Sequence, residues 1–300
     1  NARLLQAQVE LFDSEPRLAC SIVEEVLEHG CSETTACQAY MLLGASLEHL
    51  GEQAQAAEVL DQTVDLAARI GSQKQHHDAL RERAWTAMRS CDWDVAATCL
   101  AQASDLVAAT GDLLAEARIT RDQAVLAKYR GDYAEALNFC LQAEGLARQA
   151  RSDRVFTAAI ETRAEVLRLD NKHARAAELY RRVLKTEELA GWFSPISRLN
   201  LGMSLAADGE GAEAVELLVD LENRFRKQGR LAPALLAGFA LLLAEATRAA
   251  PDDLMARFDA LRAEFEDIGI VEPDFAWLFE QFAKAGEGER HAESAQLARA

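Results

Sequence analysis

A short pattern of small residues and bends returns along most of the chain, at intervals of about forty residues. Each copy has a small residue, a turn residue seven positions later, and an alanine five positions after the turn. The six copies are Ala7, Ser14 and Ala19; Gly44, Gly51 and Ala56; Ala84, Cys91 and Ala96; Ala124, Gly131 and Ala136; Ala164, Asn171 and Ala176; and Gly202, Gly209 and Ala214. Internal repeats of this length are typical of solenoids, in which each repeat buries its apolar face against the next. The pattern therefore predicts a stack of helical hairpins.

Each position in the pattern has a physical reason. Small side chains let the two helices of a hairpin approach closely, with the alanine of the second helix as the reciprocal contact. Glycine and asparagine tolerate the positive φ that a tight turn requires. A second series of glycines is expected to end the second helices, and Asp112 suits the helix start that follows. These glycines are Gly71, Gly111, Gly191 and Gly229.

Composition supports helices and an ordinary folded interior. Half of the residues are apolar, and the strong helix formers alanine, leucine, glutamate and arginine dominate. The longest apolar candidate for a membrane span, Leu231 to Ala246, is interrupted by Pro233 and Glu245, so no such span is expected. The six cysteines form no Cys-x-x-Cys pair, and we interpret them as reduced core residues of a cytoplasmic protein. Because the chain begins at Asn1 rather than methionine, we expect it to be part of a longer protein.

The clearest copy of the pattern, Leu199-Asn200-Leu201-Gly202 through Gly209 to Ala214, resembles the tetratricopeptide repeat. The forty-residue period is similar to the long variety seen in kinesin light chains, bacterial peptide-sensing regulators and the arms of bacterial signalling ATPases and kinases. Cys91 and Asn171 depart from the glycine of the family's turn. The resemblance implies an all-α, right-handed α-solenoid of about seven helix-turn-helix repeats.

The resemblance weakens toward the C-terminus. Residues 1–230 hold six repeats, and residues 231–300 are expected to form one or two divergent repeats or capping helices, continuous with the same solenoid. A seventh repeat would turn at 250–252, with Leu254 to Phe265 as its second helix. Segments 273–285 and 289–300 could be an eighth repeat or a capping pair.

In the family, the first helix of each hairpin faces the concave groove, which implies a set of partner-binding side chains. Its charged members form a basic belt, interleaved with two aromatic residues and followed by an apolar stretch from Ile196 to Leu243. The predicted groove residues are Arg81, Trp85, Arg89, Arg118, Arg121, Lys128, Tyr129, Asn200, Met203 and Phe239. Arginine forks suit carboxylates, and aromatic rings offer contact area at low entropic cost.

Two plainer interpretations stay open for this surface. The arginines could belong to a solvated face, neutralised in part by Glu82, Asp122, Glu161 and Glu165. The apolar stretch could be buried by repeat packing or by the C-terminal helices folding back. Asn200 matches an asparagine that contacts peptide backbone in related proteins. The equivalent slots (Leu42, Glu82, Asp122, Thr162 and Leu236) hold other residues.

The functional prediction is a protein-interaction scaffold, forming one arm of a larger bacterial signalling protein. The net charge of −17 argues against nucleic-acid and membrane partners. No phosphate-binding loop, metal motif or catalytic constellation is found in the sequence, so we expect no enzyme activity, cofactor or metal. The expected partner is a protein or peptide with an acidic segment, or another domain of the same full-length chain. A small-molecule or oligosaccharide sensor is the alternative.

Overall fold

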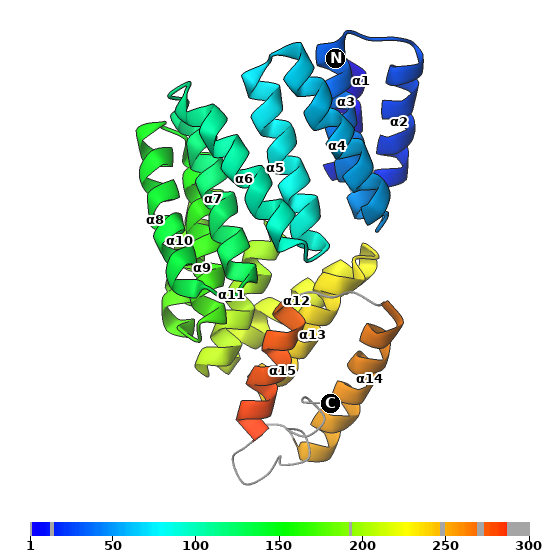
Figure 1. The fold of residues 1–300 in the computed structure, drawn as a ribbon. Coiled ribbons are helices and arrows are strands. Elements are labelled where there is room, and N and C mark those ends of the chain that lie inside the picture. Colours follow the sequence, from blue (N-terminus) through cyan, green and yellow to red (C-terminus); the bar gives the residue numbers. More distant parts are fainter. Residues whose placement is uncertain (1, 13–14, 192–193, 247–249, 269–272, 287–300) are drawn as a thin grey trace. The chain divides into compact units, whose positions relative to one another are not determined.

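A computed structural model describes residues 2–12, 15–191, 194–246, 250–268 and 273–286. Within these ranges the chain forms fifteen α-helices and no strand, as expected for an all-α solenoid (Figure 1). None of these helices is long and apolar enough to cross a membrane. The turn predicted at Ser14 and the helix predicted over 289–300 lie outside the described residues.

The helices divide into two compact units, Asn1–Phe156 and Thr157–Ala300. The helices of the first unit (unit 1) are α1 (Ala2–Phe12), α2 (Pro16–Glu28), α3 (Glu33–His49), α4 (Gln53–Ile70), α5 (Gln73–Arg89), α6 (Trp93–Ala108), α7 (Leu113–Tyr129) and α8 (Tyr133–Gln149). α9 (Asp153–Leu169) crosses from unit 1 into the second unit (unit 2). Unit 2 continues with α10 (His173–Ala190), α11 (Pro195–Asp208), α12 (Gly211–Lys227), α13 (Leu231–Glu245), α14 (Pro251–Ile268) and α15 (Pro273–Gly286). The division predicted at residue 230 stays a prediction.

The turns predicted between helices from the repeat are present in the structure wherever the residues are described. Gly51, Cys91, Gly131, Asn171 and Gly209 all have positive φ, between 56° and 85°. The four glycines expected to end second helices also have positive φ. Two further positive-φ residues, Gly30 and Arg151, were not predicted. Arg151 takes the place that glycine holds at the ends of the other second helices. Because arginine does not indicate a positive φ, this turn was not predicted.

The small residues of the repeat lie where helices approach most closely. A Cβ atom added to Gly44 would lie 2.7 Å from Cγ of Leu60, and one added to Gly202 would lie 2.6 Å from Cδ2 of Leu218. The glycine of the first helix therefore faces a leucine four residues beyond the alanine that was expected as its reciprocal contact. That alanine, Ala56 or Ala214, is fully buried in both hairpins.

Some helix starts are capped by side chains, as was expected at Asp112. Asp112 accepts hydrogen bonds from the backbone N–H groups of Leu114 and Ala115, each at 3.0 Å, and so opens α7. Ser72 caps α5 in the same way through the N–H of Gln75. These side chains satisfy donors that the first turn of a helix leaves without an intrahelical partner.

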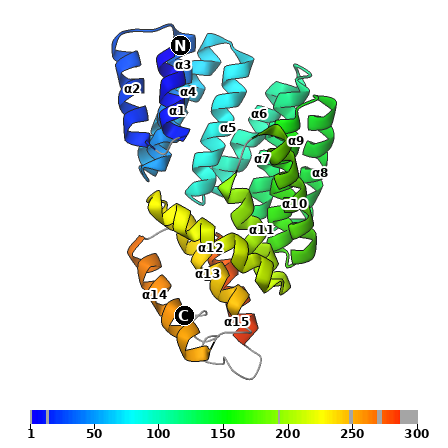
Figure 2. The same ribbon diagram turned by 180° about the vertical axis from the view of Figure 1, so that it is seen from behind.

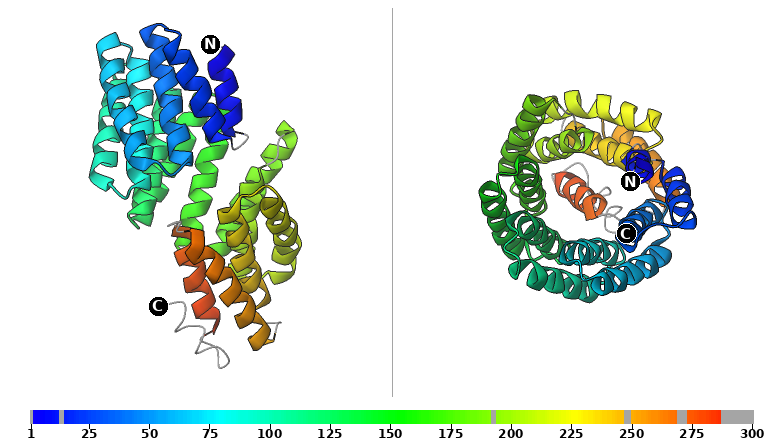
Figure 3. Two further views of the ribbon diagram at one scale, coloured as in Figure 1. Left: turned by 90° about the vertical axis from the view of Figure 1, so that its right-hand side faces the viewer. Right: turned by 90° about the horizontal axis from the view of Figure 1, so that it is seen from above.

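Within unit 1 the helices form two rows (Figures 1 and 3). The odd-numbered helices touch one another in succession, α1 with α3, α3 with α5 and α5 with α7. No comparable contact joins successive even-numbered helices in the described part of unit 1. The odd-numbered row is therefore the more closely spaced one, which makes it the inner side of the curve. We call the surface of α1, α3, α5 and α7 the odd-helix face.

The core of unit 1 lies between the two rows. One of its clusters includes Leu80, Leu100, Ile119 and Leu126, all less than a tenth exposed, and draws on α5, α6 and α7. In unit 2, α13 packs against α11, α12, α14 and α15 (Figure 2). α13 is buried along most of its length, which explains why its sequence is almost continuously apolar.

Candidate functional site

The predicted groove residues lie on odd-numbered helices, but in two different units. Arg81, Trp85 and Arg89 belong to α5, and the four residues from Arg118 to Tyr129 belong to α7, all in unit 1. Asn200 and Met203 belong to α11 and Phe239 to α13, in unit 2.

Asp122 organises the odd-helix face of unit 1. Its carboxylate is fully buried and binds two guanidinium groups. Nε and Nη2 of Arg81 lie 2.7 Å and 2.6 Å from Oδ2, and Nη2 of Arg121 lies 2.7 Å from Oδ1. Arg81 is on α5 whereas Asp122 is on α7, so the cluster joins two successive hairpins.

This cluster makes the belt less basic than its arginine count suggests. Arg81 and Arg121 keep only 11% and 24% of their side-chain surface exposed, and both pair with the same carboxylate, so the three groups together carry one positive charge instead of two. Partial neutralisation by Asp122 was one of the interpretations left open by the sequence. The pair between Arg81 and Asp122 was not predictable, because it depends on how closely α5 and α7 approach.

Glu82 is a second acidic group on this face. Burial raises its pKa to about 7; Arg81 opposes the shift, whereas Asp122, Glu48 and Asp78 add to it. Near neutral pH this carboxyl is therefore about half protonated. The charge of the odd-helix face changes within the physiological range as a result.

Arg89 is the more accessible of the two predicted groove arginines on α5. Its side chain is half exposed, and its Nε lies 3.6 Å from Oε2 of Glu48. Thr86 donates a hydrogen bond to the same carboxylate. Burial raises the pKa of Glu48, and the contacts with Thr86 and Arg89 offset part of that rise.

Arg118 differs from the other arginines of the belt. It lies one turn before Arg121 on α7, half-buried, and makes no ion pair with the described residues. Positions three apart on a helix share a face, so Arg118 extends the Asp122 cluster toward the start of α7.

Aromatic rings flank these cations. The guanidinium carbon of Arg121 lies 5.9 Å from the ring centroid of Trp85, and Nζ of Lys128 lies 4.9 Å from that of Tyr129. Tyr129 also stacks on Trp93, with ring centroids 6.1 Å apart and planes at 23°. Trp93 was missed as a site residue because it follows the turn and opens a second helix. The sequence signal was an aromatic residue two positions beyond the predicted turn at Cys91.

The three predicted site residues of unit 2 are not exposed to a partner. Asn200, Met203 and Phe239 retain 5%, 0% and 3% of their surface. The ring of Phe239 packs against Phe258, Phe275 and Phe279, with centroids 5.0–6.2 Å apart. For Phe239, the C-terminal helices α14 and α15 supply the burial, which was the alternative left open for the apolar stretch.

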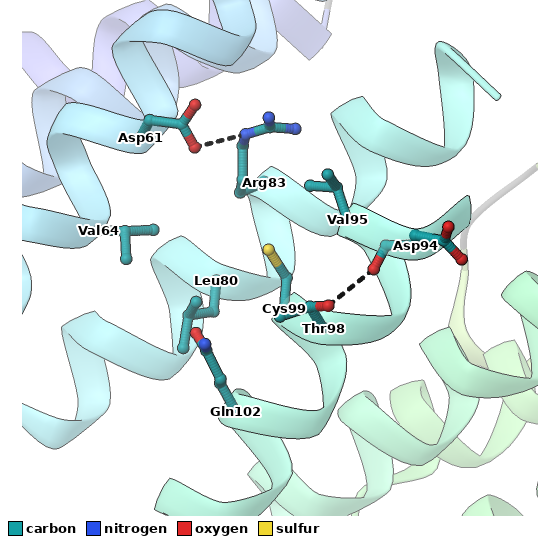
Figure 4. A pocket seen from close by; sticks show the side chains of 9 residues that line it. All are labelled: Asp61, Val64, Leu80, Arg83, Asp94, Val95, Thr98, Cys99 and Gln102. Carbon is teal, nitrogen blue, oxygen red and sulfur yellow. Dashed lines mark hydrogen bonds and ion pairs between the residues drawn. The ribbon is translucent and has the colours of Figure 1, made fainter. Parts of the chain in front are cut away.

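Another concave surface of unit 1 lies between α4, α5 and α6 (Figure 4). Asp61 and Arg83 form an ion pair at 2.7 Å on its rim. Burial raises the pKa of the Cys99 thiol, which disfavours a nucleophilic thiolate there. No predicted groove residue and no aromatic side chain belongs to its lining. The lining residues are Asp61, Val64, Leu80, Arg83, Asp94, Val95, Thr98, Cys99 and Gln102.

No group of three or more His, Cys, Asp or Glu side chains among the described residues is arranged to hold a metal ion.

No protein-family model matches the sequence. No curated protein matches it either.

Solved structures of helical-repeat proteins do resemble the fold. The Rap conjugation gene regulator of the plasmid pLS20, in complex with the Phr* peptide, has a TM-score of 0.72 at 13% identity, over 88% of this chain and 72% of that one. NprR in complex with its cognate peptide NprX has a TM-score of 0.62 at 14% identity, over 99% of this chain and 85% of that one.

A signal transduction ATPase with a tetratricopeptide repeat sensor, from Pyrococcus horikoshii, has a TM-score of 0.59 at 13% identity. The match covers 93% of this chain but 42% of that protein. At such identities the likeness concerns the fold alone, and this fold is a tetratricopeptide-like helical solenoid.

Proposed function

We propose that this tetratricopeptide-like chain is a protein-interaction scaffold whose odd-helix face in unit 1 binds an acidic peptide or partner segment. The observation that carries the proposal is the set of cations and aromatic rings on α5 and α7, of which Arg81 and Arg121 are held in place by the buried Asp122. The partner would be a separate protein or another domain of a larger signalling protein.

The geometry leaves hydrogen-bond donors for such a partner. A guanidinium group has five N–H donors, and Asp122 occupies Nε and Nη2 of both Arg81 and Arg121. The remaining donors, together with Arg118 and the half-exposed Arg89, can bind further carboxylates. Fixing a guanidinium in advance lowers the entropy lost when a ligand binds.

Two of the similar structures support a peptide as the ligand class. The Rap regulator and NprR were each solved with a bound peptide. The alternative of an oligosaccharide sensor calls for a pocket lined by aromatic rings. The concave surface between α4, α5 and α6 has none in its lining.

A peptide-display selection tests the proposal. A random peptide library is selected on the wild-type chain, on Arg89→Glu/Arg118→Glu, and on Arg69→Glu. Arg69 is exposed at the end of α4, an even-numbered helix, and serves as the matched control. These substitutions leave the ion pairs of Arg81 and Arg121 with Asp122 in place.

We expect the wild type and the Arg69→Glu control to enrich peptides rich in Asp and Glu, and the double variant to lose that enrichment. The affinity of a selected peptide should fall at least tenfold between 50 mM and 500 mM NaCl, because salt screens exposed charges. Equal enrichment of acidic peptides by all three proteins would overturn the assignment.

A further inference from the structure

The last described helix contacts residues more than a hundred positions earlier in the chain. Asp274, at the start of α15, accepts a hydrogen bond at 2.7 Å from Nη2 of Arg168 at the end of α9. Gln281, farther along α15, donates at 2.9 Å to Oδ1 of Asn171 in the turn before α10. The ring of Trp277 lies 5.7 Å from that of His173. α15 therefore lies across the ends of α9 and α10 as well as against α13.

The surface under α15 is built around one buried cation. Arg168 is 1% exposed, and its guanidinium carbon lies 4.6 Å from the ring centroid of Trp277. Phe239 of α13 supplies the apolar end of the surface through Phe275 and Phe279. We call the surface of Arg168, Asn171, His173 and Phe239 the α15-binding face.

The chemistry of this contact differs from the packing within a hairpin. There, glycine packs against leucine. Here aromatic rings and the ion pair between the buried Arg168 and Asp274 predominate, and aromatic rings and arginines are typical anchors of an interface between partners. Neighbouring hairpins of a solenoid contact one another, whereas α15 reaches back beyond its own neighbours to α9. This is the geometry of a helix bound in a groove.

α15 leaves several buried polar atoms at this face without a hydrogen-bond partner. Nε and Nη1 of Arg168, the hydroxyl of Tyr180 and Nδ1 of His173 are buried and have no hydrogen-bond partner among the described residues. Nε1 of Trp277 is also buried and has no hydrogen-bond partner among the described residues. Buried donors without partners are costly, so a segment that brings additional carboxylate oxygens to Arg168 would bind this face more favourably than α15 does.

We infer that the α15-binding face is a helix-binding site occupied by α15 as an intramolecular ligand, and that an acidic, aromatic partner helix competes for it. The required chemistry is that of α15 itself: an acidic residue in the first turn and a tryptophan three positions later. The inference is independent of the proposed function, because all of its residues lie in unit 2.

Tethering determines how such a site behaves. A ligand attached to its own site has an effective concentration in the millimolar range, so a free peptide competes poorly with an intact α15. Weakening α15 removes this competition without altering the α15-binding face.

The test uses the full chain and a fluorescent peptide with the sequence of residues 273–286. Binding is measured to wild type, to Asp274→Ala/Trp277→Ala, and to that variant with Arg168→Ala added. Glu280→Ala and Arg175→Ala are matched controls, because both residues are exposed on α15 and α10. We expect the α15 variant to bind the peptide at least tenfold more tightly than wild type does, the added Arg168→Ala to abolish this gain, and the controls to behave as wild type.

Absence of peptide binding to the α15 variant, or equal binding to wild type, would overturn the inference. Hydrogen exchange of the wild type provides a second test that does not depend on the variants folding. The amides of α15 should exchange faster than those of α13, and excess peptide should accelerate them further. Exchange of α15 only together with α11 and α13 would show that it is a permanent part of the core.

Discussion

Asp122 and Glu82 are carboxyl groups of the same inner surface with different surroundings. Asp122 binds two guanidinium groups directly, whereas burial favours the protonated form of Glu82. One group fixes cations in place and the other changes its charge near neutral pH. Stability and pH dependence can therefore be tested separately.

Replacing Asp122 with alanine should be strongly destabilising. The substitution leaves Arg81 nearly buried without its counter-charge, which costs about 3–5 kcal/mol for a fully buried pair and somewhat less here. Asp61→Ala is the matched control, because Asp61 is 62% exposed and its pair with Arg83 is worth less than about 1 kcal/mol. Urea unfolding measures both, and equal losses would contradict the role of Asp122.

The raised pKa of Glu82 makes the fold more stable in mild acid. Its pKa rises from 4.5 in the unfolded chain to about 7 in the folded one, so the folded state binds more protons between these values. Stability due to this group is complete below pH 4.5 and is lost as pH rises toward 7, by about 1–3 kcal/mol.

Glu82→Gln, which resembles the protonated acid, should therefore be more stable than wild type at pH 8 and similar to it at pH 4.5. Glu58→Gln, at an exposed position of α4, is the control. Unfolding free energies measured across this range check the prediction. A parallel pH dependence in wild type and Glu82→Gln would refute it.

Single helices are specified by local signals that a sequence displays directly. A left-handed turn residue, a capping aspartate and a small residue opposite a leucine each act within one hairpin. For this reason the turns at Gly51 and Asn171 were predicted correctly, whereas the turn at Cys91 was predicted from the repeat period. Arg151 was not, because its residue type does not indicate a left-handed turn, although the repeat period pointed to it.

Gly202→Ala tests the close approach within one hairpin. The added methyl would lie 2.6 Å from Cδ2 of Leu218, which should cost about 1–3 kcal/mol through overpacking. Gly145→Ala, in α8, is the matched control, because no atom lies within 4 Å of its added Cβ. That substitution should stabilise the chain by up to about 1 kcal/mol, since alanine is the better helix former. Thermal and urea unfolding measure the change in stability of each variant. An increase in stability in both variants would contradict the close packing of Gly202 against Leu218.

At the scale of the whole molecule, net charge and local charge have opposite effects. The chain carries a net charge of −17, which disfavours the compact state through self-repulsion. The proposed site on α5 and α7 instead gathers cations. The same addition of salt should therefore affect folding and binding differently.

Raising NaCl from 20 mM to 300 mM should increase the urea midpoint of unfolding while it weakens binding of an acidic peptide. Screening reduces repulsion among the excess carboxylates and attraction at the odd-helix face alike. Denaturation curves measure the change in stability, and peptide titrations on the same preparation measure the change in affinity. A salt-dependent loss of stability would show that specific ion pairs outweigh the net charge.

Contacts between distant segments account for what the sequence could not predict. The period of the repeat identifies which residues share a row, and so placed Arg81 and Arg121 on one face. It does not reveal that Arg81 pairs with Asp122, or that Trp93 stacks on Tyr129, because these contacts join different hairpins. The return of α15 to Arg168 spans 106 positions and has no periodic signal.

The bond between Arg81 and Asp122 has a mechanical consequence. It joins α5 to α7 along the inner row of unit 1, where successive hairpins would separate if the curve were straightened. Separating α5 from α7 under force would have to break this bond, so this part of unit 1 should resist small loads and yield abruptly beyond them. The carboxylate of Asp122 would then contribute to the mechanical stiffness of this part of the chain.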